Sequence, residues 1–213
     1  MFDQRDVDYV IDAHTNHAKE PRNVVRKWDS KTPYHIHPIW CATTILTETQ
    51  LSEEDRVTGA MALLYHDVLE DTTAELPEWL SRGIRNFIGF MTFADSTEEM
   101  ELVWTMEPYV RLLKLYDKVS NLLDGAWMST GQRAVYENYT AHLCLDAVEN
   151  FGPLNITRMA KVFVSEEVWI GATNAQWRRT EAMKKKEQLR PRHGSEKERH
   201  YPDRRPYDTE DSG

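Results

Sequence analysis

Apolar residues recur at three- and four-residue spacings along most of the chain, whereas no stretch alternates apolar and polar residues between turn signals. The first pattern is typical of amphipathic helices and the second of strands. The pattern therefore predicts an all-α protein. We expect helices over about 5–19, 38–46, 53–66, 77–88, 96–107, 109–123, 132–149 and 165–188.

Three local signals place the starts of these helices. Pro38 suits a first helical turn, because proline lacks an N–H group and its φ angle is already helical. Ser52 can serve as the N-cap of the next helix, with acidic residues at 53–55 near its positive end. Ser96, followed three residues later by Glu99, predicts a capping box.

The composition is that of one globular domain with a tail. The chain has 213 residues, of which 40% are hydrophobic, enough for one well-packed core. Residues 184–211 contain nine Lys or Arg and seven Asp or Glu, with too little apolar surface to offset the entropy of ordering. We therefore expect a domain over 1–183 and a charged, flexible C-terminal tail over 184–213.

Charge and cysteine content narrow the class of partner and the compartment. A net charge of −9 disfavours a nucleic-acid binder, because such a surface must neutralise phosphates. The chain shows no apolar leader and no apolar run long enough to cross a bilayer, and two cysteines are too few for a disulfide framework. These features predict a cytoplasmic protein without nucleic-acid or membrane partners, and they leave a homo-oligomer open.

One short stretch combines a histidine with three carboxylates: His66, Asp67, Glu70 and Asp71. Read as a helix, it places His66 beside Glu70, and Asp67 beside both Glu70 and Asp71. The preceding residues are almost wholly apolar, which directs this helix inward. Buried charge is kept only when it is paired or bound to metal, so the stretch indicates a chemical site more strongly than a solvated acidic helix end.

Two further residues could join this site. His37 stands at the start of the second predicted helix, and Asp117 lies inside an otherwise apolar helix. Together with His66 and Asp67 they offer two imidazoles and two carboxylates, a mixture that favours manganese, iron or zinc over calcium. For Asp117 the alternative is a buried structural ion pair with a neighbouring lysine, Lys114 or Lys118.

The segments at 32–38, 66–71 and 113–122 resemble the HD-domain metal-dependent phosphohydrolases. More narrowly, they are similar to the hydrolase domain of RelA/SpoT proteins, which includes stand-alone small alarmone hydrolases and animal SpoT homologues. The His-Asp pair alone is nonspecific. The trailing Glu-Asp, the Pro-Tyr-x-x-His-Pro segment and the Asp-Lys-x-x-Asn segment narrow the resemblance, which covers roughly residues 10–150.

This resemblance implies an HD-domain helical bundle and a small-molecule nucleotide substrate. The activity that it implies is removal of the 3′-pyrophosphate from the guanosine alarmones ppGpp and pppGpp, which yields GDP or GTP and pyrophosphate. The implied cofactor is Mn²⁺, with Fe²⁺, Zn²⁺ and Co²⁺ as alternatives.

Carried over position by position, the resemblance assigns three sets of residues. The implied metal ligands are His37, His66, Asp67 and Asp117. The groups implied to orient or deprotonate the attacking water are Glu70 and Asp71. The implied substrate contacts are Arg26, Lys27, Asn121 and Arg133.

The chain departs from the family pattern on the substrate side. Tyr116 replaces the small residue that usually precedes the last ligand, which predicts an altered wall beside the metal. The tyrosine expected one helical turn after Arg133 falls on Glu137, between Tyr136 and Tyr139, so its register stays open. The connection from 71 to 117 is also shorter than usual, and residues from 155 onward have no clear counterpart.

Three alternatives to an alarmone hydrolase follow from these residues. The first is another HD-family phosphohydrolase, acting on dNTPs, other nucleotides or NADPH. The second is a non-catalytic nucleotide or metal sensor, which would have damaged catalytic carboxylates, yet Glu70 and Asp71 are both present. The third, a structural helical partner protein, leaves Asp117 and the His66-Asp67 pair unexplained.

Overall fold

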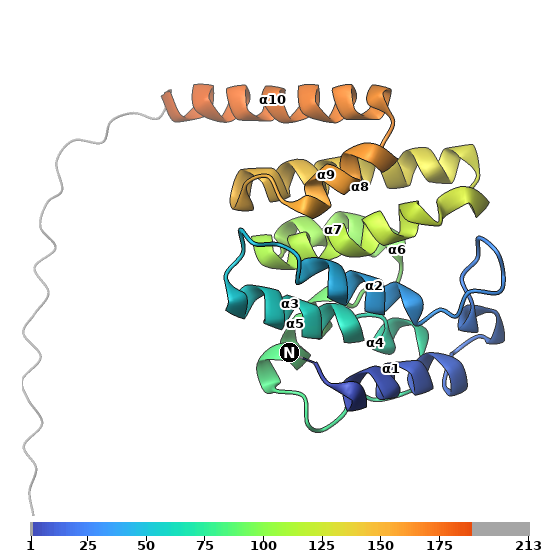
Figure 1. Ribbon diagram of the computed structural model, residues 1–213. Helices are drawn as coiled ribbons and strands as arrows, with labels where there is room; N and C mark the ends of the chain where they lie inside the picture. The colour runs from blue at the N-terminus through green and yellow to red at the C-terminus, as the bar shows by residue number, and fades with distance from the viewer. Residues whose placement is uncertain (1, 189–213) are drawn as a thin grey trace, which may run out of the picture. The chain divides into compact units, whose positions relative to one another are not determined.

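A computed structural model of the chain describes residues 2–188, and Figure 1 shows helices joined by loops. Within them the only strand-like pairings are two isolated bridges, Ala18 with Thr72 and Val25 with Pro33. The all-α prediction is confirmed. The α-helices are α1 (Gln4–Asn16), α2 (Ile36–Ile45), α3 (Glu53–Tyr65), α4 (Val68–Asp71), α5 (Arg82–Met91), α6 (Ser96–Leu102), α7 (Pro108–Leu123), α8 (Thr130–Phe151), α9 (Asn155–Phe163) and α10 (Glu166–Gln188). Three short 3₁₀ helices cover Pro21–Val24, Val103–Thr105 and Gly125–Trp127.

The chain up to Gln176 forms one compact unit, and a second unit begins at Trp177. Of the second unit, residues 177–188 are described, and they are helical. The predicted boundary after residue 183 stays a prediction, because residues 184–188 belong to α10 and the rest of the predicted tail lies outside the described residues. No helix within 2–188 is long and apolar enough to cross a membrane.

Helix α7 is the centre of the first unit. It packs against α8 and α9 on one side and against α2 on the other, and in Figure 1 it lies between α2 and the pair formed by α8 and α9. Its buried side chains come from every face of the helix, with Leu112, Leu113, Leu115 and Val119 fully covered. Asp117 is therefore placed in the core by the helix that carries it.

Two predicted helix starts hold and one helix is interrupted. Ser52 caps α3, where its hydroxyl accepts the Asp55 N–H at 3.0 Å, and Pro38 lies within the first turns of α2. However, α3 ends at Tyr65 and α4 begins at Val68, so the predicted continuous helix is wrong at His66 and Asp67. His66 and Asp67 stand between the two helices, and their side chains come within 3.0 Å of each other.

Three other predictions about helices need correction. Helix α5 begins at Arg82 behind the cap Ser81, not near residue 77. The capping box at α6 is absent: Asp95 is the N-cap, and its carboxylate accepts the N–H groups of residues 97 and 98. Glu99 does not cap the helix; its side chain is buried and pairs with lysines of α7. Helix α9 was not predicted.

The crossing of α3 with α2 and α7 requires a glycine, which makes the first testable prediction. A Cβ atom at Gly59 would lie 2.5 Å from Ile45 Cδ1, 2.6 Å from the Tyr109 hydroxyl oxygen and 3.1 Å from Leu113 Cδ2. We expect Gly59→Ala to lower the free energy of unfolding by about 1–3 kcal/mol through overpacking. Urea denaturation measures this change.

Gly89→Ala is the matched control for this substitution. Gly89 also lies inside a helix, α5, but is exposed, and a Cβ atom there meets nothing within 4 Å. Alanine should stabilise this helix by roughly 0.5–1 kcal/mol, because it has the higher helix propensity. Equal stabilities for the two variants would contradict the packing described at the crossing.

Candidate metal centre

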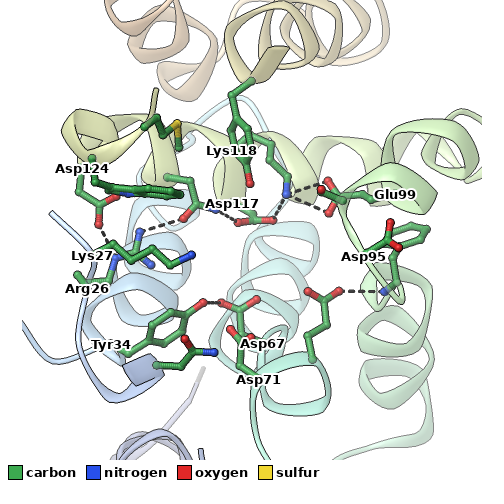
Figure 2. Close-up of a pocket in the computed structure, with 18 of the residues that line it drawn as sticks. Arg26, Lys27, Tyr34, Asp67, Asp71, Asp95, Glu99, Asp117, Lys118 and Asp124 are labelled. Atoms are coloured by element: carbon green, nitrogen blue, oxygen red, sulfur yellow. Dashed lines mark hydrogen bonds and ion pairs between the residues drawn. The ribbon is translucent and has the colours of Figure 1, made fainter. Parts of the chain in front are cut away.

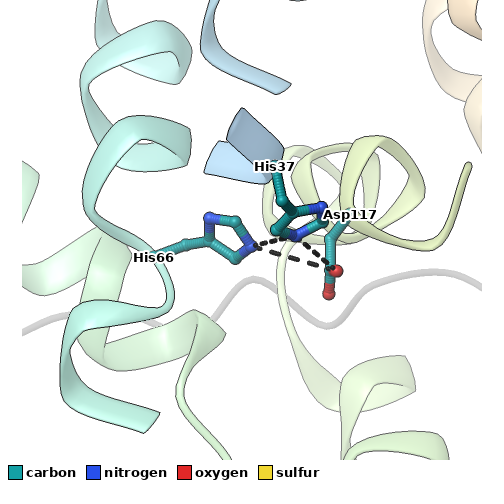
Figure 3. A group of neighbouring side chains, drawn as sticks. All are labelled: His37, His66 and Asp117. Atoms are coloured by element: carbon teal, nitrogen blue, oxygen red, sulfur yellow. Dashed lines mark hydrogen bonds and ion pairs between the residues drawn. The ribbon is translucent and has the colours of Figure 1, made fainter. Parts of the chain in front are cut away.

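Three buried side chains from separate helices converge beside α7. His37 comes from α2, His66 from the end of α3 and Asp117 from α7, and Figure 3 shows them pointing toward one another. The two Nε2 atoms are 3.3 Å apart, and Asp117 Oδ1 lies 3.4 Å from that of His37 and 3.9 Å from that of His66. One ligand atom from each residue lies within 4.8 Å of the others, so the group could hold a metal ion.

The second nitrogen of each imidazole is already hydrogen-bonded. His66 Nδ1 lies 2.7 Å from the carbonyl oxygen of Leu63, which can only accept, so this nitrogen carries the hydrogen. His37 Nδ1 lies 2.8 Å from the Ser120 hydroxyl oxygen. Such contacts fix the orientation of a ligating imidazole and leave Nε2 for the metal. The donor set therefore fits a divalent transition ion.

Asp67, the fourth predicted ligand, borders this group. Its Oδ1 lies 3.0 Å from His66 Nε2, and its Oδ2 lies 3.3 Å from His37 Nε2 and accepts the Tyr34 hydroxyl at 2.8 Å. It is not one of the three residues whose ligand atoms all lie within 4.8 Å of one another. The structure thus brings Asp67 to the site, and its role as a ligand stays a prediction.

The carboxylates and the imidazoles stabilise each other's charged forms. Burial alone would lower the pKa of His66, but the charges of Asp67 and Asp117 raise it to about 9. Burial alone would raise the pKa of Asp117, but Lys118, Lys114 and the two histidines hold it well below its usual range. A metal ion that binds here must displace the proton on Nε2 of His66.

Both interpretations of Asp117 from the sequence describe the same carboxylate. Its Oδ1 faces the histidines and accepts the Asn121 side-chain N–H at 2.7 Å. Its Oδ2 lies 3.0 Å from Lys118 Nζ and 3.5 Å from Lys114 Nζ. One oxygen of Asp117 is therefore the candidate metal ligand, and the other oxygen forms the ion pairs.

A cavity of about 320 Å³ opens beside the group, and Figure 2 shows most of the side chains that line it. Glu70 and Asp71 are among them. Glu70 Oε1 accepts the N–H of Phe93 at 2.9 Å. Burial and the charge of Asp67 raise the pKa of Glu70 to about 7 against the opposing effect of Lys114. Burial and Asp67 raise the pKa of Asp71 as well. Both carboxylates are suited to handling protons.

Three of the four predicted substrate contacts line the cavity. Arg26 donates from Nη2 to Asn121 Oδ1 at 2.9 Å and from Nε to Asp124. Lys27 Nζ lies 4.5 Å from the centroid of the Trp127 ring. Arg26, Lys27 and Asn121 thus all line the cavity, and Figure 2 shows Arg26 and Lys27 on the same side of it.

The fourth predicted contact, Arg133, is not among the residues that line the cavity. Its Nε donates to Glu137 at 2.8 Å, and Glu137 in turn accepts the N–H of Ser165. Its role as a substrate contact stays a prediction. The neighbouring tyrosine register is decided by the geometry: Tyr136 lines the cavity, whereas Tyr139 packs against Trp104.

Comparisons with known proteins bear on the fold. No protein-family model and no curated protein matches the chain. A solved structure does: that of a metazoan orthologue of SpoT, described as hydrolysing ppGpp and as having a role in starvation responses. The match has 20% sequence identity and a TM-score of 0.56, and it covers 75% of this chain and 91% of the other. The chain has the HD-type fold of this orthologue.

Tyr116, which replaces the small residue usual in the family, does not form part of the cavity wall. Tyr116 is fully buried and does not line the cavity, so that prediction is wrong. Its hydroxyl donates to Glu48 Oε1 at 2.9 Å, and Glu48 also accepts the N–H groups of Asn155 and Ile156 at 2.8 Å. Tyr116 thus supports the start of α9, on the far side of α7 from the candidate metal centre.

Several residues that line the cavity were not predicted from the sequence. Among them are Tyr34, Glu99, Lys118, Asp124, Trp127 and Tyr136. Tyr34 stands inside the 32–38 motif, and Lys118 was considered only as an ion-pair partner, so a sequence signal existed for both. Glu99 had been assigned to a helix cap, and the spacing of Asp124 and Trp127 carries no signal of its own.

Removal of one imidazole tests the metal centre. We expect His66→Ala to weaken Mn²⁺ binding by at least about 100-fold, because loss of a ligand should cost no less than loss of a residue that only orients a ligand. Isothermal titration calorimetry on the full chain measures the affinity. His142→Ala is the control, since His142 bonds only to the carbonyl of Asn138 on its own helix. Unchanged binding in His66→Ala would place the metal elsewhere.

Proposed function

We propose that this protein is a metal-dependent phosphohydrolase that removes the 3′-pyrophosphate from ppGpp and pppGpp and releases GDP or GTP and pyrophosphate. The observation that carries the proposal is the buried group of His37, His66 and Asp117, which borders a cavity lined by Glu70 and Asp71. The solved structure that shares the fold is described as hydrolysing ppGpp, which supports the choice of substrate.

Manganese is the proposed metal, with iron, zinc and cobalt as alternatives, since nitrogen and oxygen donors suit all four. His37, His66 and Asp117 would hold it, and Asp67 is the proposed fourth ligand. When bound, a divalent cation supplies positive charge that stabilises negative charge on phosphoryl oxygens and makes water more acidic.

Glu70 and Asp71 are the proposed proton-handling groups. In the reaction, water attacks the phosphorus atom attached to the ribose 3′-oxygen, and the bond between these two atoms breaks. The water oxygen becomes part of pyrophosphate, and the 3′-oxygen gains a proton. Glu70, whose pKa is about 7, is suited to take the proton of the water near neutral pH, and Asp71 lies beside it to orient that water.

The distribution of charge in the cavity supports one orientation of a nucleotide. Figure 2 shows Arg26 and Lys27 on one side of the cavity and Asp95 on the opposite side, where Lys118 balances the charge of Glu99. We propose that the phosphates remote from the reaction lie at the cationic side. Lys27 is exposed there, whereas Arg26 and Lys118 are buried.

The runner-up is an HD-type hydrolase of another nucleotide, such as a dNTP or NADPH. One observation favours it: Arg133, one of the predicted substrate contacts, does not line the cavity, while Asp95 adds negative charge to the wall. A substrate with fewer phosphates than ppGpp would need fewer cations there.

A substrate panel separates these functions. With Mn²⁺ present, we expect pyrophosphate release from ppGpp to exceed the phosphate or triphosphate release from NADPH and dGTP in kcat/KM. Chromatography of the products identifies the bond that is cleaved. Preference for dGTP or NADPH would establish the runner-up, and binding of Mn²⁺ and nucleotide without turnover of any substrate would indicate a sensor.

Substitution of the two carboxylates tests the proposed division of labour. We expect Glu70→Gln and Asp71→Asn each to lower kcat by about 10²–10⁴-fold, the usual range for loss of a general acid or base, with Mn²⁺ affinity largely retained. Glu78→Gln, at an exposed position, is the control. Full turnover by the doubly substituted protein would show that other groups handle the protons.

A further inference from the structure

Four buried charges form a closed cluster beside the candidate metal centre. Asp117, Glu99, Lys114 and Lys118 are each no more than 5% exposed. Two of them are negative and two are positive, so the cluster as a whole is neutral. Glu99 reaches it from α6, and the other three stand on α7.

Each lysine is shared between the two carboxylates. Lys118 Nζ lies 2.8 Å from Glu99 Oε1 and 3.0 Å from Asp117 Oδ2. Lys114 Nζ lies 3.0 Å from Glu99 Oε2 and 3.5 Å from Asp117 Oδ2, and it approaches Glu70 Oε1 at 3.8 Å. Two ammonium groups thus face the oxygen of Asp117 that is turned away from the histidines.

Without Glu99, this arrangement would work against a metal ion. Asp117 and the two buried ammonium groups would then carry a net charge of +1 together. A positive charge next to the metal ligands repels a cation strongly where water is excluded. Glu99 supplies the second negative charge and draws both ammonium groups toward α6. Its negative charge leaves Asp117 Oδ1 able to attract a cation.

We infer that Glu99 is a positioning residue of the metal centre: it balances and holds Lys114 and Lys118, and so sets the affinity of the His37, His66 and Asp117 group for a divalent cation. This inference rests on the metal-dependent part of the proposed function and is independent of the nucleotide that is cleaved. The inference also explains why Glu99 faces the lysines and does not form the predicted capping box.

Mn²⁺ affinity of the full chain, measured by calorimetry, tests the inference without any substrate. Glu99→Gln should weaken Mn²⁺ binding by roughly 10–100-fold, the range typical of residues that orient metal ligands. Glu101→Gln makes the same change of charge on an exposed position of α6 and should leave the affinity unchanged.

The lysine partner separates charge balance from a merely structural role. Lys118→Met removes an ammonium group 3.0 Å from Asp117, so it should tighten Mn²⁺ binding, and the combined Glu99→Gln, Lys118→Met protein should return toward the affinity of the unsubstituted chain. A structural role predicts instead that both single variants weaken binding and that the combined variant is weakest. That pattern, or equal affinities in Glu99→Gln and Glu101→Gln, would overturn the inference.

The inference stays testable if Glu99→Gln does not fold, and its failure can be told apart from failure of the proposed function. If Glu99→Gln does not fold, as judged by its thermal transition, weakened binding in Lys118→Met overturns the inference and tightened binding supports it. If the unsubstituted chain binds Mn²⁺ but hydrolyses no alarmone, the proposed substrate is wrong, and the affinities of the variants still decide the role of Glu99.

Discussion

The burial of one carboxylate, Asp117, constrains the rest of the site. An ionised carboxylate in an apolar core is costly unless charges and hydrogen bonds surround it. Asn121 and the two lysines supply part of this compensation from the same helix, and the imidazoles of His37 and His66 supply the remainder from α2 and α3. The packing of α2 and α3 near α7 is therefore also what completes a candidate metal centre.

Contacts within one helix could be predicted from the sequence, because spacing alone decides them. The neighbours of Asp117 on α7, including Lys114 and Asn121, follow from three- and four-residue intervals. The interruption after Tyr65 could not be predicted in this way, since a helical pattern places His66 and Asp67 on different faces. The two side chains nevertheless come within 3.0 Å of each other, at the point where α3 ends.

Contacts between distant segments explain the other differences between the predicted and the observed helix starts. Ser96 and Glu99 have the spacing of a capping box, but the buried lysines of α7 attract Glu99 more strongly than an exposed helix end does. Helix α9 has Leu154 at its N-cap, which carries no local signal for a helix start. Glu48, more than a hundred residues earlier, accepts the first N–H groups of that helix, and no sequence pattern announces such a bond.

The same reasoning explains why the metal centre is better determined than the substrate. Buried charges such as Asp117 and His66 have few arrangements that satisfy them, so residue type and burial together restrict what they can do. The cavity beside them is lined partly by exposed side chains such as Lys27, which water can satisfy in many positions. Arg26 is the intermediate case: it lines the cavity, yet Asn121 and Asp124 already hold its guanidinium group. On the proposed function, a nucleotide phosphate that binds there must either share Arg26 with Asp124 or displace that carboxylate.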